Sequence, residues 1–436
     1  MSECQTIVAL SSGAVPSGIA VIRISGVQAK MALESLIGGL PEPRVAKLSD
    51  LRGRDGQVLD RGIILWFPSP NSFTGEDCAE LHIHGGAAVV QAILNELTSF
   101  DTIRLAEPGE FSRRAFENGK LDLTEIEGIA DLIASETEEQ RKQALAQSIG
   151  SLRDLYEDWR RRIIHARALI EAELDFSEEE DVPEEISQQG FVEIETLKSE
   201  IENHLNDNRA GEIIRDGFRV AIMGKPNAGK SSLLNCLAKR DVAIVTEQAG
   251  TTRDVIDVYL DLDGFAVIVS DTAGIRDSSD IVEQEGIRRA EERGKQADLV
   301  IWLQEITDSS EQQGPDIDGV PVLHIISKDD GRALGAGKSI STETSYGIDL
   351  LISQVSERIR ETTKGSNNSL ISRVRYRNAL KETLRLLKAS ADTGLVDLDL
   401  RADMLRTAGD CIGRITGRID VEDLLDVIFS EFCVGK

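Results

Sequence analysis

The sequence has no long apolar run and little cysteine. No apolar stretch approaches 18 residues, and its beginning lacks the basic and then apolar pattern of a secretory signal. The five cysteines contain no C-x-x-C pair and no framework spacing, which favours reduced thiols over disulfides. We therefore expect a cytoplasmic protein that makes no membrane contact.

Basic residues are also scarce relative to acidic ones. The 436 residues include 49 Lys and Arg but 76 Asp and Glu, which gives a formal net charge of −27. A surface this acidic repels phosphate backbones, so a broad basic platform for nucleic acid is excluded. The net charge does not exclude a local basic groove or the docking of RNA through a partner protein.

A phosphate-binding loop is the most specific motif present. Gly224–Ser231 reads GKPNAGKS and fits the P-loop pattern G-x-x-x-x-G-K-[ST]. An apolar run, 218–223, precedes it and a helical segment, 232–238, follows it, which is the context that this motif requires. Backbone N–H groups of such a loop surround the β-phosphate, Lys230 neutralises phosphate oxygens, and the Ser231 hydroxyl binds Mg²⁺. The sequence therefore predicts a nucleoside triphosphate site.

Three downstream segments complete a predicted GTPase site. The loop containing Thr251 and Thr252 precedes the expected strand 255–260 and is the switch I candidate. Asp271-Thr272-Ala273-Gly274 follows a short strand and matches D-x-x-G, whose Asp holds the Mg²⁺ water shell. The predicted nucleotide contacts are Asn227, Ala228, Gly229, Lys230, Ser231, Ser232, Thr246, Glu247, Gln248, Ala249, Gly250, Thr251, Thr252, Asp271, Thr272, Ala273, Gly274, Ser327, Lys328, Asp330, Ser341 and Thr342, with Mg²⁺ on Ser231 and Thr252.

Base selection is predicted at 327–330, which reads SKDD where guanine-binding proteins commonly have N-K-x-D. Asp330 fits the guanine-selecting position and Lys328 lies along the base. Ser327 replaces an Asn whose amide ties neighbouring loops together, and Ser341-Thr342-Glu343 departs from the common S-A-K. We expect GTP as the ligand, with base affinity affected by these departures. Gly335–Ser339 resembles a second P-loop but lacks its first glycine and a following helix, so we reject it.

Hydrolysis requires a residue that the usual position does not supply. Ile275 stands directly after D-x-x-G, where many GTPases have a water-orienting glutamine, and Glu283 and Glu285 follow in the same segment. The side-chain carbonyl of Asn227 could hold a monovalent cation against the phosphates, in place of an arginine. The sequence thus indicates a cation-assisted GTPase.

The periodicity of apolar residues divides the chain into four segments. Residues 1–119 are mixed α/β, with strands expected at 19–24, 62–67 and 79–83 and helices after Gly86 and at 111–116. Spacings of three and four predict one long helix from Leu145 to Leu174, with Thr124-x-x-Glu127 as a capping box for a preceding helix. Residues 216–362 alternate strands and helices, which predicts a parallel sheet with helices on both faces. Helical segments at 120–215 and 363–436 would then form one domain that the nucleotide-binding domain interrupts.

The chain resembles the family of bacterial tRNA modification GTPases known as MnmE or TrmE along nearly its whole length. The matching segments are TIVALSSGAVPSGIAVIRISG at 6–26, AELHIHGG at 79–86, EPGEFSRRAFENGKLDL at 107–123, DFSEEEDV at 175–182 and GRITGRIDVEDLLDVIFSEFCVGK at 413–436. The resemblance implies an N-terminal dimerisation domain and a helical domain interrupted by a Ras-like GTPase domain.

The resemblance also implies chemistry and partners. Members form homodimers whose N-terminal domain binds 5-formyl- or methylene-tetrahydrofolate. They form a heterotetramer with the FAD-dependent protein MnmG (GidA), which shares tRNA binding. Together the two proteins add an aminomethyl or carboxymethylaminomethyl group to C5 of the wobble uridine of certain tRNAs. The matching motifs imply that the folate site contains Arg23, Glu80, Lys120 and Lys436. They imply that K⁺ is bound by Asn227, Thr246, Gln248 and Thr251. Glu283 matches the glutamate that orients the attacking water, and Cys433 is the cysteine of the terminal C-x-G-K.

Two other functions are compatible with the GTPase motifs. A GTP-dependent ribosome or RNA assembly factor would need a basic RNA-binding domain, and a membrane-remodelling GTPase would need a lipid-facing segment; the sequence has neither. His82 and His84 stand two apart on one predicted strand, as a metal pair would, but no third ligand has suitable spacing.

Overall fold

The computed structural model describes residues 5–175, 186–207, 209–240, 242–244, 257–271, 292–306, 317, 319–330, 338–364, 371–392, 397–419, 422–430, 432 and 435. Two compact units contain them: Met1–Ala130 with Gly413–Lys436, and Asp131–Ile412. Each unit has its own buried apolar clusters.

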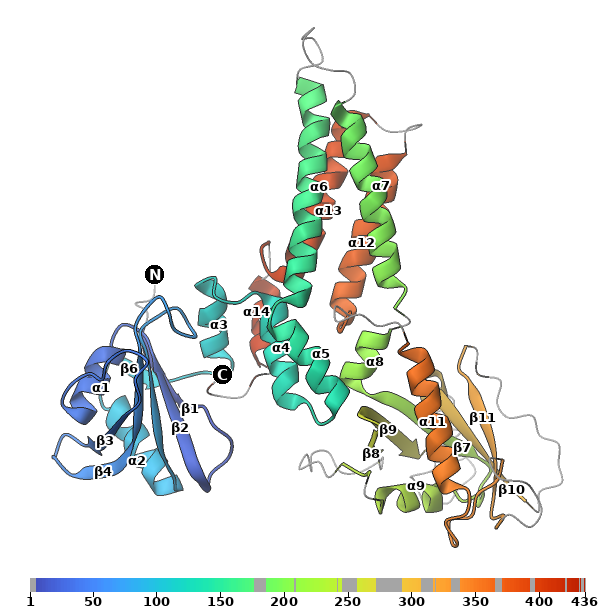
Figure 1. The fold of residues 1–436 in the computed structure, drawn as a ribbon, viewed down its shortest axis with the longest axis horizontal. Helices are drawn as coiled ribbons and strands as arrows, with labels where there is room; N and C mark the ends of the chain where they lie inside the picture. The colour runs from blue at the N-terminus through green and yellow to red at the C-terminus, as the bar shows by residue number, and fades with distance from the viewer. Residues whose placement is uncertain are drawn as a thin grey trace, which may run out of the picture. The chain divides into compact units, whose positions relative to one another are not determined.

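A six-stranded sheet forms the first unit, in the order β3-β4-β5-β2-β1-β6 (Figure 1). The strands are β1 (Thr6–Leu10), β2 (Ser17–Ser25), β3 (Lys47–Arg52), β4 (Val58–Phe67), β5 (Cys78–Gly85) and β6 (Ile103–Leu105). All neighbours are antiparallel except β1 and β6. Helices α1 (Ala29–Ile37) and α2 (Ala87–Thr98) share an apolar core with one face of the sheet. The predicted strands at β2, β4 and β5 are confirmed.

The opposite face of this sheet carries polar side chains. Because facing residues of antiparallel neighbours point to the same side, Arg23, Leu65 and Glu80 form one row across β2, β4 and β5. A second row, on the same face, contains His82, Ile63 and Leu48. Ile63 and Leu48 are 45% and 60% exposed, so apolar surface borders the polar row.

The end of the chain packs inside the first unit. Helix α14 (Glu422–Ser430) joins residues of α3 (Glu110–Glu117) and of the beginning of α4 (Leu123–Ala134) in a small apolar cluster. The close contact between Phe429 of α14 and the residue before α3 requires glycine at position 109. There φ is +69°, and a Cβ atom would lie 2.6 Å from the carbonyl oxygen of Phe429. The helix predicted at 111–116 is confirmed, and α14 lies within the helical segment expected at 363–436.

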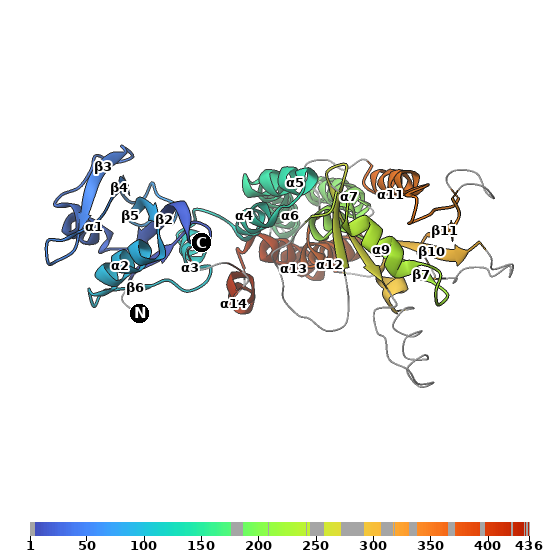
Figure 2. The ribbon, with the colours of Figure 1, turned by 90° about the horizontal axis from the view of Figure 1, so that it is seen from below.

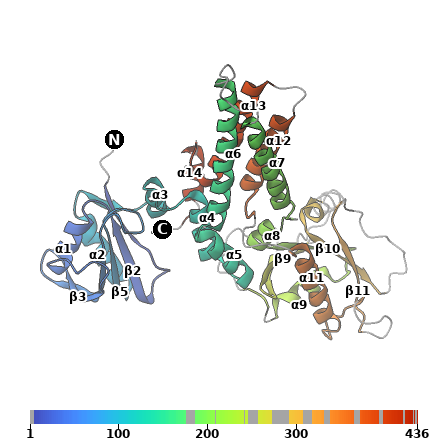
Figure 3. The same ribbon diagram turned by 45° about the horizontal axis from the view of Figure 1, so that its top comes forward.

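Long helices form one part of the second unit. Helices α6 (Ser151–Asp175), α7 (Ile186–Leu205), α12 (Val374–Ala391) and α13 (Leu398–Thr416) run side by side (Figures 1 and 3), and Figure 2 looks along their common direction. Their apolar stripes meet in the interior, where Trp159 is 2% exposed. Segments on both sides of the nucleotide-binding residues therefore build one helical bundle. The acidic run 177–185 lies outside the described residues.

Two local predictions in this region are wrong. The helix expected from Leu145 to Leu174 is two helices, because α5 (Glu138–Ser148) ends before Gly150, whose φ of +94° ends the α-helical path. Thr124 and Glu127 do not cap a helix, since both lie within α4. Asp122 caps it instead and accepts hydrogen bonds from the backbone N–H of Glu125 and the hydroxyl of Thr124.

The nucleotide-binding part contains a five-stranded sheet in the order β11-β10-β7-β9-β8. Its strands are β7 (Phe218–Gly224), β8 (Asp257–Leu262), β9 (Phe265–Asp271), β10 (Leu299–Glu305) and β11 (Val322–Ser327). The prediction of a parallel sheet fails at β8, which turns back through Asp263-Gly264 and pairs antiparallel to β9. Helices α9 (Lys230–Ala238) and α11 (Ile348–Thr362) cover one face. Ala221, Met223 and Val300 face the other side and pack against Ala297 and Ile317.

None of the described helices combines the length and the apolar character that a bilayer crossing requires.

A histidine lies at the polar end of the bundle core. The hydroxyl of Tyr156 and Nε2 of His204 are 3.2 Å apart, and Trp159 meets the imidazole edge to face at 5.3 Å. Burial lowers the pKa of His204 to about 4 from 6.5, and the charge of Asp207 opposes this shift. The folded protein therefore holds this imidazole neutral.

We predict an acid-sensitive contribution to stability from His204. Its pKa is lower in the folded state, so this contribution is complete above about pH 6.5 and disappears as pH falls toward about 4. Between pH 7 and pH 5 the free energy of unfolding of the bundle should fall by about 2 kcal/mol from this group alone. Urea unfolding followed by Trp159 fluorescence, with Trp66 and Trp302 replaced by Phe, measures it. The His204→Gln variant should lack this loss; an equal loss in both proteins would contradict the assignment.

Candidate functional site

The loop between β7 and α9 has the backbone shape of a phosphate-binding loop. Gly224 has a φ of +151°, and a Cβ atom there would lie 2.3 Å from the carbonyl oxygen of Leu303, so no other residue fits beside β10. Asn227 and Gly229 also have positive φ values, 65° and 95°. Gly229 precedes the first turn of α9, so the free N–H groups of this helix begin at the loop, as an anion site requires.

Lys230 closes the loop on itself. Its Nζ donates hydrogen bonds to the carbonyl oxygens of Gly224 and Lys225, both at 2.9 Å. Burial lowers the pKa of this ammonium group, and the nearby Asp271 carboxylate opposes the shift. A desolvated lysine held in this way provides a positive charge for phosphate oxygens.

Ser231 and Asp271 meet at the other side of the loop. The Ser231 hydroxyl donates a hydrogen bond of 2.6 Å to Oδ2 of Asp271, at the end of β9, and Asp271 is 3% exposed. A hydroxyl and a carboxylate oxygen beside a triphosphate loop are the hard ligands that Mg²⁺ prefers, directly or through water. These two residues therefore fit a magnesium ion.

Ser327 links the base-binding segment to the P-loop. Its hydroxyl donates to the carbonyl oxygen of Ala228 at 2.6 Å and contacts that of Gln304 at 3.3 Å. Ser327 thus connects the two loops directly, as the Asn that it replaces is expected to do.

The remaining base-site residues lie around the ends of β10 and β11. Lys328 has a φ of 61°, and its Nζ lies 3.0 Å from Oε1 of Glu305. Asp330 is exposed. Ser341 is 7% exposed and accepts a hydrogen bond from the backbone N–H of Thr344, while its neighbour Thr342 is half-buried. A hollow of about 270 Å³ lies between the P-loop and the end of β10, lined by Lys225, Pro226, Ala228, Trp302, Leu303, Gln304 and Glu305.

Several predicted residues lie outside the described residues. They are Thr246, Glu247, Gln248, Ala249, Gly250, Thr251, Thr252, Thr272, Ala273, Gly274, Glu283, Cys433 and Lys436. Asn227 and Ser232 are described and exposed on the P-loop and the first turn of α9.

A second candidate site lies on the polar face of the N-terminal sheet. Arg23, Glu80 and Lys120, from β2, from β5 and from the loop after α3, line one cavity of about 400 Å³. The other lining residues are Arg44, Phe67, Asn71, Ser72, Phe73 and Cys78. Arg23 bonds Oε1 of Glu80 through Nη2 at 3.0 Å and lies 4.9 Å from the centre of the Phe73 ring. The structure thus brings together three residues that are far apart in sequence.

The two histidines of β5 each lie near a carboxylate. His84 pairs with Asp60 at 2.8 Å, whereas His82 lies 3.4 Å from Oε2 of Glu80. Within the described part of the chain, no group of three or more His, Cys, Asp or Glu residues is placed to hold a metal ion.

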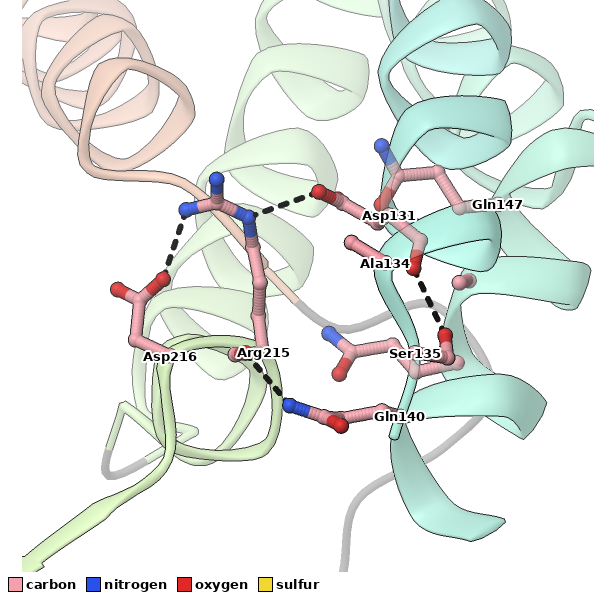
Figure 4. A pocket seen from close by; sticks show the side chains of 9 residues that line it. Asp131, Ala134, Ser135, Gln140, Gln147, Arg215 and Asp216 are labelled. Atoms are coloured by element: carbon pink, nitrogen blue, oxygen red, sulfur yellow. Dashed lines mark hydrogen bonds and ion pairs between the residues drawn. The ribbon is translucent and has the colours of Figure 1, made fainter. Parts of the chain in front are cut away.

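A polar junction joins the nucleotide-binding part to the helices in the second unit (Figure 4). Oδ1 of Asp131, in α4, accepts hydrogen bonds from Arg215 at 3.1 Å and from Arg373 at 2.9 Å. Arg215 belongs to α8 (Ala210–Asp216), directly before β7, and Arg373 directly precedes α12. Gln140 donates to the carbonyl oxygen of Arg215 at 3.0 Å. One carboxylate therefore bridges the chain where it enters and where it leaves the nucleotide-binding part.

Sequence reasoning missed several of these residues. Arg44, Phe67 and Phe73 of the N-terminal cavity stand in segments without a motif, and the cavity exists only because strands β2, β4 and β5 are neighbours. Glu305, the partner of Lys328, ends an apolar strand and carries no pattern of its own. The alternating pattern of β4 was the only signal that could have placed Phe67 beside Cys78.

Comparisons with known proteins cover the whole chain. A family model described as the MnmE helical domain matches residues 123–433, and one described as the GTP-binding protein TrmE N-terminus matches residues 6–120. The tRNA modification GTPase MnmE of Chelativorans sp. (strain BNC1) is 51% identical over 435 residues, covering 99% of this chain and 98% of that protein. That of Rhizobium meliloti (strain 1021) is 50% identical over 441 residues and covers both chains completely.

A solved structure resembles part of the chain. A variant of Era from Aquifex aeolicus, bound to GDP and AlF4⁻, is 23% identical and covers 38% of this chain and 66% of its own, with a TM-score of 0.26. This likeness is too slight to support an argument.

We predict that Ser327 contributes to nucleotide affinity through its bond to the P-loop. In Ser327→Ala the Ala228 carbonyl loses a buried donor, at a cost of about 1 kcal/mol, so GDP and GTP should bind roughly five- to tenfold more weakly. Titration with a fluorescent GDP analogue measures this. Ser353→Ala, an exposed serine of α11 that bonds only its own helix, is the matched control. Unchanged affinity in Ser327→Ala would show that the bond is dispensable.

Proposed function

The chain belongs to the family of the tRNA modification GTPase MnmE, and from that membership we propose how it acts on tRNA. It is a GTP hydrolase that uses Mg²⁺. With the FAD-dependent partner MnmG, it adds an aminomethyl or carboxymethylaminomethyl group to C5 of the wobble uridine of certain tRNAs, using a tetrahydrofolate one-carbon unit. The observation that carries this proposal is identity at half of all positions, over the full length, with relatives named for tRNA modification.

The proposed hydrolysis site uses the P-loop geometry described above. Lys230 and the N–H groups at the start of α9 hold the phosphates, and Ser231, Thr252 and Asp271 hold Mg²⁺ and its water. Asn227, exposed with a φ of 65°, is placed at the outer surface of the loop, which supports its proposed contact with K⁺. Thr246, Gln248 and Thr251 would complete the potassium site, and Glu283 would orient the attacking water. Potassium then supplies the positive charge that stabilises the transition state.

The proposed folate site is the cavity on the N-terminal sheet. Its volume of about 400 Å³ is within the range of small-molecule sites, and aromatic rings and charged groups share its walls. Glu80 can accept hydrogen bonds from the pterin ring of a folate, and Arg23 fixes that carboxylate from the neighbouring strand. Lys120 would contact the anionic part of the ligand, and Lys436, at the end of the chain, would complete the pocket.

Dimerisation through the first unit is supported by its exposed apolar row. Leu48 and Ile63 face each other across β3 and β4 on the same sheet face as the cavity. Covering this row in a homodimer would remove apolar surface from water. We also propose that the chain is divided into four segments, 1–119, 120–215, 216–362 and 363–436. The second and fourth segments together form the helical domain that the third interrupts.

We predict that GTP turnover depends on K⁺ through Asn227. Turnover should be about tenfold or more faster in K⁺ than in Na⁺ at equal ionic strength, because the added cation lowers the barrier by more than about 1.4 kcal/mol. Asn227→Ala should reduce the rate in K⁺ to the rate in Na⁺. Asn235→Ala, an exposed asparagine of α9, is the control and should behave as the wild type. Equal wild-type rates in the two salts would refute the potassium site.

We predict that cells lacking this chain lose the aminomethyl-type groups on wobble uridines. Mass spectrometry of tRNA nucleosides from such cells, and from cells complemented with variants, measures the loss. The wild type and Glu285→Ala should restore the modification, whereas Glu283→Ala should bind GTP but neither hydrolyse it nor restore the nucleoside. Unaltered wobble nucleosides in the deletion strain would refute the proposed function.

A further inference from the structure

The cavity on the N-terminal sheet holds more positive charge than its own carboxylate balances. Three cations, Arg23, Arg44 and Lys120, line it, together with one carboxylate, Glu80. Arg23 forms an ion pair with Glu80. Among the described residues, neither Arg44 nor Lys120 makes an ion pair. A ligand that fills the cavity is therefore expected to be anionic on one side.

Arg44 is held in a fixed position although it is exposed. Its backbone N–H donates to the carbonyl oxygen of Trp66 at 2.8 Å, and its φ is 64°. Its guanidinium donates through Nη2 to the carbonyl oxygen of Asn71 and lies 5.6 Å from the centre of the Phe67 ring. A guanidinium has five N–H donors, so most of them stay available after the bond to Asn71. The usual entropic cost of ordering a long side chain is thus already met by the protein.

Differences in exposure separate the floor of the cavity from its rim. Cys78 is buried at 3% exposure and Glu80 is half-buried, both on β5, whereas Arg44 is exposed on the loop before β3. An elongated ligand with a flat hydrogen-bonding ring and a charged tail matches this gradient. Its ring would lie at Glu80 between aromatic side chains, and its tail would leave past Arg44.

We propose that Arg44 binds the γ-linked glutamate tail of a tetrahydrofolate, so that the site prefers poly-γ-glutamyl forms over forms without a tail. This inference rests on the folate site proposed above. A planar guanidinium bonds a carboxylate in a bidentate manner, and each added glutamate brings a further carboxylate to the rim. Arg44 is therefore a specificity residue for the tail, separate from the groups that hold the ring.

The test compares three ligands on the full-length protein: 5-formyl-tetrahydropteroate, which has no glutamate, and its mono- and triglutamyl forms. Calorimetric titration of the wild type should give an affinity that rises along this series. Arg44→Gln should bind the triglutamyl form about tenfold more weakly and the tail-less form within about twofold of the wild type. Arg44→Lys should show an intermediate loss, because it keeps the charge without the fork.

Control variants distinguish an error in the tail assignment from an error in the folate site itself. Arg52→Gln removes another exposed arginine of the same sheet, one that pairs with Asp50 outside the cavity, and should leave all three affinities unchanged. Thermal unfolding checks that each variant is folded. If Arg44→Gln weakens the three ligands equally, or none of them, the tail assignment is wrong while the folate site stands. If the wild type binds none of the three ligands, the folate site itself is wrong, and the assignment falls with it.

Discussion

Asp131 ties the nucleotide-binding part to the rest of the second unit at both of its ends. One oxygen of its carboxylate bonds Arg215, where the chain enters the five-stranded sheet, and Arg373, where it returns to the bundle. Gln147 of α5 adds a second contact where the chain returns to the bundle, because it accepts a hydrogen bond from the Ser372 hydroxyl at 2.9 Å. Removing the carboxylate would take away the partner that the two guanidinium groups share, while Arg215 would keep its ion pair with Asp216 at 2.8 Å.

The same region contacts the hairpin that ends at Asp271. The backbone N–H of Glu139, at the start of α5, donates to the carbonyl oxygen of Gly264, in the turn between β8 and β9. Strand β9 runs from that turn to Asp271, which accepts the hydrogen bond of Ser231. Strand β8 begins just after the switch I candidate. One backbone hydrogen bond therefore links α5 to the hairpin whose second strand ends at Asp271.

Motifs with a local physical cause were predictable from the sequence. The P-loop context of strand and helix and the apolar stripes of the helices depend on short-range pattern, and the structure agrees with them. The break at Gly150 was not predictable, because the apolar spacing continues across it. The antiparallel β8 was missed because a two-residue turn and a helical crossover leave similar patterns in the strands themselves. The contacts of Arg44 and Glu305 are with residues brought near by the fold, so no local pattern predicted them. The hydrogen bond of Ser327 to the P-loop could not be predicted from its residue type.

The bundle is assembled from helices that are distant in the chain, and this affects the order of its synthesis. Helix α7 packs against both α6 and α12, but the five-stranded sheet is translated between α7 and α12. While the ribosome produces that sheet, α6 and α7 still lack their later neighbours α12 and α13. The nucleotide-binding part, whose segments are contiguous, can complete its own core first. The bundle can therefore be completed only after the nucleotide-binding part has been synthesised.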